Sequence, residues 1–232
     1  MFTGIVQAVA TISEVSENNG IRSFVIEFPN GFCEELAIGA SVSIDGVCLT
    51  ATRLLTPNKV SFDVMLQSLN VTTLGNFRVG SAVNAERAAK DGAEIGGHPL
   101  SGHIDFKAEV IEIARMDDNF RMRIGVEKRW MRYIFPKGYI AVNGASLTIA
   151  EVDKASGWFE VWLIPETLRM TTIGEKGVGN HLNVEIERET QVVVDTIREA
   201  FQENLGELMP VMEKLLAENG VDINALAHKK VQ

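Results

Sequence analysis

The feature that most constrains this chain of 232 residues is an internal repeat. The segment VSIDGVCLT at residues 42–50 matches IAVNGASLT at residues 140–148, a spacing of 98 residues. The same spacing places TGIV at 3–6 on SGHI at 101–104, and a single-residue shift then places NAE at 84–86 on NVE at 183–185. Matches in one order along the chain indicate two copies of one structural unit, about 1–90 and 100–188, followed by a tail.

Within each copy the apolar residues alternate with polar ones, which is the pattern of half-buried strands. Clear strands are predicted at 23–28, 60–64, 107–113 and 158–164, with turn residues such as Asn18-Asn19-Gly20 between them. Many short strands at even spacing predict a mostly β fold with one small closed barrel per copy. Short helices are predicted at 128–134 and directly after the matching segments 67–69 and 166–168.

The tail changes to helical periodicity from Thr190 onward. Its apolar positions recur three and four residues apart, at Val193, Val194, Ile197, Ala200, Phe201, Leu205 and Leu208. A second helix is predicted over 211–219, with Pro210 at its start and Gly220 at its end. The apolar stripe either folds back on the barrels or packs against the same helix of other subunits, and the pattern does not choose. The predicted division is 1–97, 98–189 and 190–232.

Composition and charge exclude several classes of protein. The net charge of −9 argues against a nucleic-acid partner, which requires a basic surface. The first ten residues lack the charged and apolar regions of a secretory signal, and no apolar run reaches the roughly 18 residues that span a membrane. The two cysteines, Cys33 and Cys48, are therefore expected to be free thiols in the cytoplasm.

The residues alone give only weak candidates for chemistry. Phosphate-binding loops, dinucleotide fingerprints and nucleophile elbows are absent, and the four histidines show no metal-ligand spacing, so no metal site is expected. Cys48 and Ser146 occupy the same position of the repeat. A buried cysteine is more often a small hydrophobe than a nucleophile, and His103 and Lys137 each fit a structural role as well as a functional one.

Six motifs, however, resemble one known family. They are MFTGIVQ, GVCLT, GGHPLSGHID, KGYIAVNGASLT, LIPETL and NVEIE, and they occur in order within about residues 1–200. On this basis the chain is identified as similar to the riboflavin synthase family. The resemblance implies two tandem six-stranded Greek-key barrels with a C-terminal helix, and a homotrimer whose active site lies between barrels of neighbouring subunits. It also implies conversion of two molecules of 6,7-dimethyl-8-ribityllumazine into riboflavin and 5-amino-6-ribitylaminouracil, without cofactor or metal.

The resemblance implies a substrate pocket on each barrel. The matching positions in the first barrel are Gly4, Ile5, Val6, Cys48, Leu49, Thr50, Asp63, Val64, Met65, Leu66, Gln67 and Ser68. Those in the second barrel are Gly102, His103, Ile104, Lys137, Ser146, Leu147, Thr148, Trp162, Leu163, Ile164, Pro165, Glu166 and Thr167. The implied catalytic residues are His103, Ser146, Cys48, Thr148, Lys137 and Glu187.

The implied reaction needs a proton removed from the 7-methyl group of one lumazine, addition to the other, and two rings held face to face. Positioning of this kind is worth roughly 7–11 kcal/mol of barrier. His103 is expected to move protons or orient water, because imidazole does both near neutral pH. Ser146 and Cys48 are expected to add to the ring or polarise it, and for Ser146 a hydrogen-bonding role is equally consistent with the sequence.

Two positions depart from the family pattern. Gln67-Ser68 stands where the family usually has Glu-Thr, and Glu187 stands where Asp is common. The main alternative is a non-catalytic lumazine- or flavin-binding protein of the same fold, of the antenna type, and a more distant one is an unrelated β-barrel interaction protein.

Overall fold

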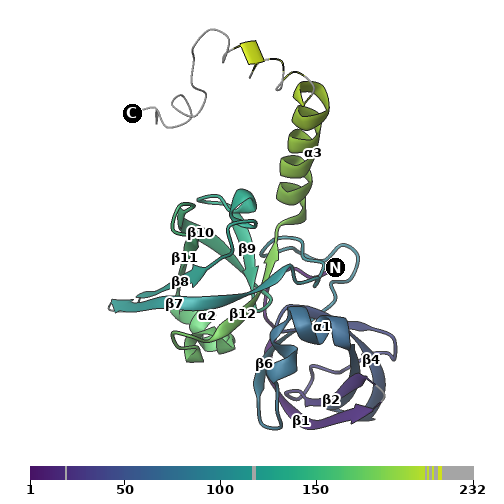
Figure 1. The fold of residues 1–232 in the computed structure, drawn as a ribbon. Coiled ribbons are helices and arrows are strands. Elements are labelled where there is room, and N and C mark those ends of the chain that lie inside the picture. The colour runs from purple at the N-terminus through teal and green to yellow at the C-terminus, as the bar shows by residue number, and fades with distance from the viewer. Residues whose placement is uncertain (19, 117–118, 207, 209–210, 212–213, 216–232) are drawn as a thin grey trace. The chain divides into compact units, whose positions relative to one another are not determined.

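Two closed β-barrels dominate the part of the chain that the computed structural model describes, namely residues 1–18, 20–116, 119–206, 208, 211, 214 and 215. Residues 1–188 form one unit, which contains both barrels, and residues 189–232 form another. The predicted boundaries of the second tail helix, Pro210 and Gly220, and most of 211–219 lie outside the described residues. The predicted class of fold is confirmed (Figure 1).

The first barrel closes in the strand order β1-β2-β5-β4-β3-β6, with β6 pairing back to β1. The non-consecutive order is that of a Greek key. Its strands are β1 (Ala8–Asn18), β2 (Ile21–Glu27), β3 (Ser41–Ile44), β4 (Val47–Thr56), β5 (Lys59–Met65) and β6 (Ala82–Arg87).

The second barrel repeats this topology with each strand in the equivalent place, in the order β7-β8-β11-β10-β9-β12. Its strands are β7 (Phe106–Met116), β8 (Asn119–Gly125), β9 (Tyr139–Val142), β10 (Ala145–Asp153), β11 (Trp158–Leu163) and β12 (His181–Ile186). Even the irregularities recur, because the shift between Ile12 and Glu14 in β1 matches that between Val110 and Glu112 in β7. Such bulges bend a strand and help a small sheet to close.

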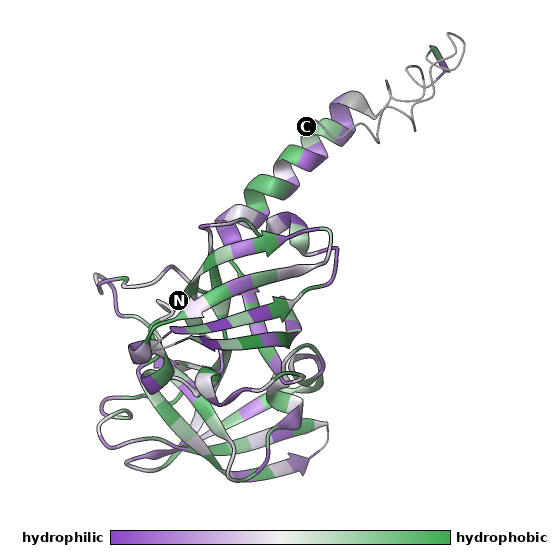
Figure 2. Ribbon diagram, turned by 90° about the vertical axis from the view of Figure 1, so that its left-hand side faces the viewer, coloured by the Kyte–Doolittle hydropathy of each residue, from purple (hydrophilic) through white to green (hydrophobic). Residues whose placement is uncertain are grey.

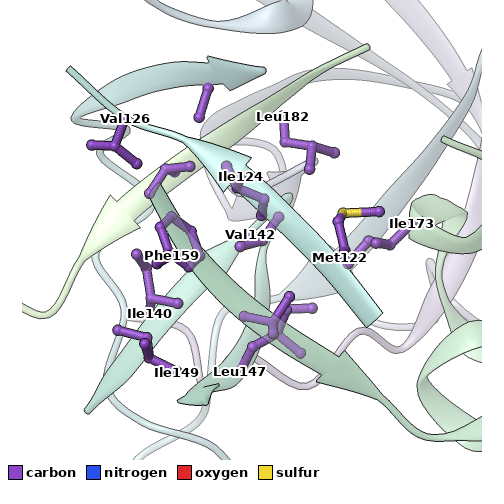
Figure 3. Packing of buried hydrophobic residues seen from close by; sticks show 14 of the residues in the cluster. Met122, Ile124, Val126, Ile140, Val142, Leu147, Ile149, Phe159, Ile173 and Leu182 are labelled. Carbon is purple, nitrogen blue, oxygen red and sulfur yellow. The ribbon is translucent and has the colours of Figure 1, made fainter. Parts of the chain in front are cut away.

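Alternation along the strands explains why each barrel has its own core. Inward positions are apolar and outward positions mostly polar, which is visible as alternating colours along the strands in Figure 2. In the second barrel the buried side chains include Met122, Ile124, Val142 and Phe159, which point into one packed interior (Figure 3). The first barrel has a separate core that includes Phe24, Ile44 and Phe62.

The short helices differ in detail from the prediction. A helix after each of the segments 67–69 and 166–168 was expected, but α1 (Leu66–Val71) and α2 (Pro165–Met170) begin before them. Proline at the first helical position explains the start of α2, since its fixed φ suits a first turn. The predicted helix at 128–134 is only the 3-10 turn η2 (Met131–Tyr133), and similar turns, η1 (Thr73–Asn76) and η3 (Thr172–Glu175), follow α1 and α2.

The helix predicted from Thr190 is present as α3 (Arg188–Leu205). Val193, Ile197 and Phe201 are exposed on it at helical spacing. Among the described helices, none has both the length and the apolar character that crossing a bilayer requires.

The two barrels meet through a buried polar network that follows the repeat. The side chain of Asn84 donates to the carbonyl of Asn143 at 2.9 Å and accepts from the backbone N–H of Thr172 at 2.7 Å. Asn183 does the same in reverse, donating to the carbonyl of Asp45 at 2.8 Å and accepting from the N–H of Thr73 at 2.7 Å. The reciprocal bonds satisfy all these buried groups and fix one barrel against the other.

Candidate functional site

The first few residues of each copy of the repeat, 3–6 and 101–104, lie against the barrel formed by the other copy. The backbone N–H of Ser146, in the second barrel, donates to the carbonyl of Gly4 at 2.8 Å, and the N–H of Cys48, in the first barrel, donates to the carbonyl of Gly102 at 2.8 Å. Val6 accordingly packs in the core of the second barrel, and Ile104 packs against the core of the first. The sequence assigned residues 4–6 to the first-barrel pocket and residues 102–104 to the second-barrel pocket. The observed contacts differ, because each segment lies against the opposite barrel.

A two-residue bridge holds the crossing point. Phe2 and Leu100 pair as antiparallel partners, with N–H to carbonyl distances of 2.8 and 2.9 Å in the two directions. Phe2 is buried against Cys48 and Ala141. As a result, Gly4 of the first copy covers Ser146, and Gly102 of the second copy covers Cys48.

Glycine is required where each segment passes over the opposite barrel. Gly4 has a φ of +76°, and a Cβ there would lie 2.5 Å from the Cβ of Ser146. Gly102 has a φ of +78°, and its Cβ would lie 2.6 Å from that of Cys48. Both the left-handed backbone and the close approach exclude a side chain.

Ser146 is paired with a histidine that the sequence analysis did not select. Nδ1 of His98 lies 2.6 Å from Oγ of Ser146, and the His98 ring stacks on Tyr139 with centroids 5.1 Å apart. A Cβ on Gly97 would lie 2.9 Å from Oγ of Ser146, so the absence of a side chain at Gly97 allows this approach. The Gly-Gly-His sequence was the signal that could have found the pair, but Ser146 is distant in the chain.

The electrostatic setting of His98 favours neutral imidazole. The ring is 2% exposed, and burial lowers its pKa from the usual value, while the negative charge of Glu187 acts in the opposite direction. Nε2 is buried and has no hydrogen-bond partner among the described residues. The structure thus pairs the predicted Ser146 with a histidine that was missed, and the charge of the predicted Glu187 acts on the same histidine.

His103 lies in a different place from Ser146 within one chain. It is exposed, and it stands between Gly102 and Ile104, both of which contact the first barrel. Its backbone N–H donates to Oγ of Ser101 at 3.2 Å. His103 is therefore positioned on the Cys48 side.

The remaining predicted residues divide between barrel faces and barrel cores. Thr50, Asp63 and Met65 are exposed on β4 and β5, and Thr148, Trp162 and Ile164 are exposed on and just after the equivalent β10 and β11. The exposed helical positions are Leu66, Gln67, Pro165 and Glu166, with Ser68 and Thr167 half-buried. Leu49, Val64, Leu147 and Leu163 point into the cores, so only their backbone groups can meet a ligand.

Several of these exposed side chains are held by neighbours. Oγ of Ser23 donates to Asp63 at 2.5 Å. Nε1 of Trp162, at the position equivalent to Asp63, donates to the carboxylate of Glu160 at 2.7 Å. Lys137 is exposed in a turn with a φ of +67°.

One groove on the described surface is lined by few of the predicted residues. A groove of about 860 Å³ is lined by Thr3, Ile5, Arg87 and the loop 29–32. It contains Ile5 from the predicted set, but neither Cys48 nor Ser146 lines it. The described residues include no group of three His, Cys, Asp or Glu side chains placed to hold a metal ion.

Comparison with known proteins finds one family that matches each copy of the repeat. The family described as lumazine binding domain matches residues 3–88 and again 101–187. Riboflavin synthase of Escherichia coli (strain K12) is 46% identical over 198 residues, which cover 85% of this chain and 92% of the relative, and riboflavin synthase of Chlamydia pneumoniae is 42% identical with 85% and 96% covered. The crystal structure of LumP complexed with riboflavin superposes with a TM-score of 0.73 at 30% identity, covering 81% of this chain and 100% of LumP.

Two tandem barrels, each matched over its length by the lumazine binding domain, define the class as a duplicated lumazine-binding barrel protein. The extent and level of identity then decide between members of this class. The chain belongs to the riboflavin synthase family.

Proposed function

We propose that this protein converts two molecules of 6,7-dimethyl-8-ribityllumazine into one riboflavin and one 5-amino-6-ribitylaminouracil. The observation that carries the proposal is a duplicated barrel with unlike chemistry at equivalent positions, Cys48 in one and a Ser146–His98 pair in the other. A reaction between two copies of one molecule needs two similar binding sites, and a reaction in which they take different roles needs those sites to differ.

The reaction balances without another reactant. One lumazine gives up a four-carbon unit, from its two methyl groups and the ring carbons that carry them, and becomes the pyrimidine. The other receives the unit and becomes riboflavin, so electrons and atoms stay within the pair. The proposal therefore includes no cofactor and no metal.

The residues around Ser146 suit proton transfer. With its pKa lowered by burial, His98 is neutral at physiological pH, and its Nδ1 can take the proton of the Ser146 hydroxyl in one tautomer or donate to Oγ in the other. We assign to this pair either removal of the 7-methyl proton or activation of a water. The exposed His103, Thr148 and Lys137 remain proposed catalytic groups, as does Cys48 on the first barrel.

A homotrimer is part of the same proposal. Val193, Ile197 and Phe201 on α3 form an exposed apolar row, and Met65 and Trp162 are exposed on faces proposed to bind substrate. Burial of such side chains favours association. We propose a homotrimer in the cytoplasm, where the free thiols Cys33 and Cys48 remain reduced, with the division 1–97, 98–189 and 190–232. Removing 190–232 is expected to dissociate the trimer, measured by light scattering.

The first test mixes the purified protein with 6,7-dimethyl-8-ribityllumazine and separates the products by chromatography. The proposal predicts riboflavin and the pyrimidine in equal amounts, with two lumazines consumed for each pair and no additive required. Lumazine that is bound, fluorescent and unchanged would instead identify an antenna-type carrier.

Two matched histidine variants separate the proposed roles. His98→Ala removes the partner of Ser146, and His103→Ala removes an exposed ring on the other side. A general acid or base contributes about 10²–10⁴-fold, so loss of that size identifies the group that moves protons. If His103→Ala keeps near-wild-type turnover, its proposed role is wrong, and an unimpaired Ser146→Ala enzyme excludes Ser146 from the chemistry.

A further inference from the structure

Two buried carboxylates stand at equivalent positions at the junction of the barrels. Glu86 on β6 is 2% exposed and Glu185 on β12 is 4% exposed. Charged side chains are seldom buried to this degree unless hydrogen bonds or ions satisfy them. The partners of these two carboxylates therefore indicate what they hold in place.

Each carboxylate is bound by three donors in the same arrangement. Oε1 of Glu86 accepts from the backbone N–H and the hydroxyl of Thr3 at 2.6 and 2.7 Å, and Oε2 accepts from the N–H of Gly4 at 3.0 Å. Oε1 of Glu185 accepts from the N–H and the hydroxyl of Ser101 at 2.7 Å each, and Oε2 accepts from the N–H of Gly102 at 3.0 Å. Hydrogen bonds to a charged acceptor are among the strong ones in proteins.

The bound glycines are those that cross to the opposite barrel. The N–H of each glycine donates to the carboxylate of its own copy, and its carbonyl accepts a hydrogen bond from the opposite copy. Gly4 therefore links Glu86 to the backbone of Ser146, and Gly102 links Glu185 to the backbone of Cys48. The tight packing of each glycine on the Cβ of Ser146 or Cys48 leaves little room for the link to shift.

We propose that Glu86 and Glu185 are positioning residues that act across the barrels, Glu86 on Ser146 and Glu185 on Cys48. The catalytic consequence rests on the proposed function. The structural link does not, and it can be measured without turnover.

Strand pairing alone predicts that each carboxylate acts within its own barrel. Glu86 pairs with Ser43, which pairs with Cys48 in the same barrel, so proximity within the sheet connects Glu86 to Cys48. Glu185 is connected in the same way to Ser146 through Ala141. The two routes predict different partners for the same carboxylate, which makes the proposal decidable.

Replacement by glutamine breaks the link at one bond. In Glu86→Gln the amide oxygen can still accept from Thr3, but the amide nitrogen then faces the N–H of Gly4, and two donors cannot bond. Volume and burial are conserved. The freed Gly4 is left in a left-handed conformation with one fewer restraint.

The first experiment measures hydrogen exchange of single backbone amides in the full chain, by NMR or by mass spectrometry with fragmentation to residues. In Glu86→Gln the amide of Ser146 is expected to exchange about tenfold faster or more, and that of Cys48 to remain unchanged. Glu185→Gln should give the reverse pattern. Ile26→Val, in the core of the first barrel, is the control for general loss of stability.

Acceleration at both amides equally, at neither, or at the residue in the same barrel would overturn the proposal. A global loss of stability appears as faster exchange throughout the cores in the Ile26→Val control and the glutamine variants alike. A cross-barrel effect confined to one amide cannot arise that way.

The second experiment uses double-mutant cycles on turnover. Glu86→Gln is expected to lower turnover about tenfold, to have less than about a twofold effect once Ser146→Ala is present, and to keep its full effect beside Cys48→Ala. Full additivity with Ser146→Ala would contradict a role through Ser146. If the wild-type protein binds lumazine without converting it, the proposed function fails, while the exchange experiment still decides on the link.

Discussion

Replacing Asp45 by asparagine is expected to stabilise the protein at neutral pH and to remove most of one pH dependence. Asp45 lies in the turn between β3 and β4, is 1% exposed, and belongs to the network between the barrels. Its Oδ1 accepts from the N–H of Asn84 at 2.7 Å. Burial raises the pKa of Asp45 to about 7, against the lowering effects of this hydrogen bond and of the charge of Lys176.

The magnitude follows from the two pKa values. The unfolded chain releases this proton near 3.8, whereas the folded protein retains it to about 7. The stabilising contribution is therefore fully present below about pH 4 and is lost as the pH rises to about 7. At about 1.36 kcal/mol per pKa unit, the loss in free energy of unfolding is about 4 kcal/mol.

Asparagine fits this position, because the equivalent residue of the second barrel already is one. Asn143 has a φ of +44° against +45° for Asp45, and its Oδ1 accepts from the N–H of Asn183 at 2.7 Å. In Asp45→Asn the new amide nitrogen would face that of Asn143, from which the present Oδ2 lies 3.4 Å away. That repulsion is independent of pH, so it lowers the free energy of unfolding of the variant equally at every pH and does not change how that free energy varies with pH.

The assay is urea unfolding at pH 5 to 8 and a fixed protein concentration. The advantage of Asp45→Asn over the wild type should grow by about 2.5 kcal/mol across this range. The exposed Asp91→Asn is the matched control, and the exchange Asp45→Asn/Asn143→Asp should restore the pH dependence. A difference that stays constant with pH would refute the reasoning.

Three further outcomes test other parts of the structure. Gly46→Ala should destabilise the fold by several kcal/mol, because its Cβ would lie 2.8 Å from the backbone nitrogen of Gly144, whereas Gly80→Ala, with the same left-handed φ but open space, should cost about 1–2 kcal/mol in urea unfolding. Because burial lowers the pKa of His98, neutral His98 contributes to the free energy of unfolding above about pH 6.5, and this contribution is lost as the pH falls. His98→Asn should therefore flatten the decline of stability between pH 7 and 5. Asn183→Ala leaves two buried backbone groups unpaired and should cost about 3 kcal/mol or more, measured by the same unfolding assay.

The fold was predictable because the repeat and the strand periodicity are local signals that the barrels obey. Alternating residues report which side of a strand is buried, and the matching segments 42–50 and 140–148 report that two barrels share one plan. The same signals cannot report what buries a residue. Val6 is apolar in either arrangement, and only the three-dimensional structure places it in the second barrel.

Candidate site residues could be selected from the sequence, but the contacts between them could not. Ser146 and Cys48 were selected because they occupy matching positions of the repeat. His98 was not selected, because the Gly-Gly-His sequence does not indicate that its partner is a serine 48 residues away. Glu187 stays a predicted catalytic residue, and its negative charge raises the pKa of His98 against the larger lowering effect of burial. Contacts between residues far apart in the chain are the part that periodicity and spacing leave open.

The exchange of segments changes what duplication means in this chain. If each copy were self-contained, a substitution in one copy would alter one site, and the two would diverge independently. Here Ser146 is covered by Gly4 from the first copy, and Cys48 by Gly102 from the second. Each barrel therefore contributes backbone to the other's candidate centre, so neither centre is complete in one copy alone. A substitution in either copy can therefore affect both candidate centres, although the carboxylate contacts of Glu86 and Glu185 are alike while Cys48 and Ser146 differ.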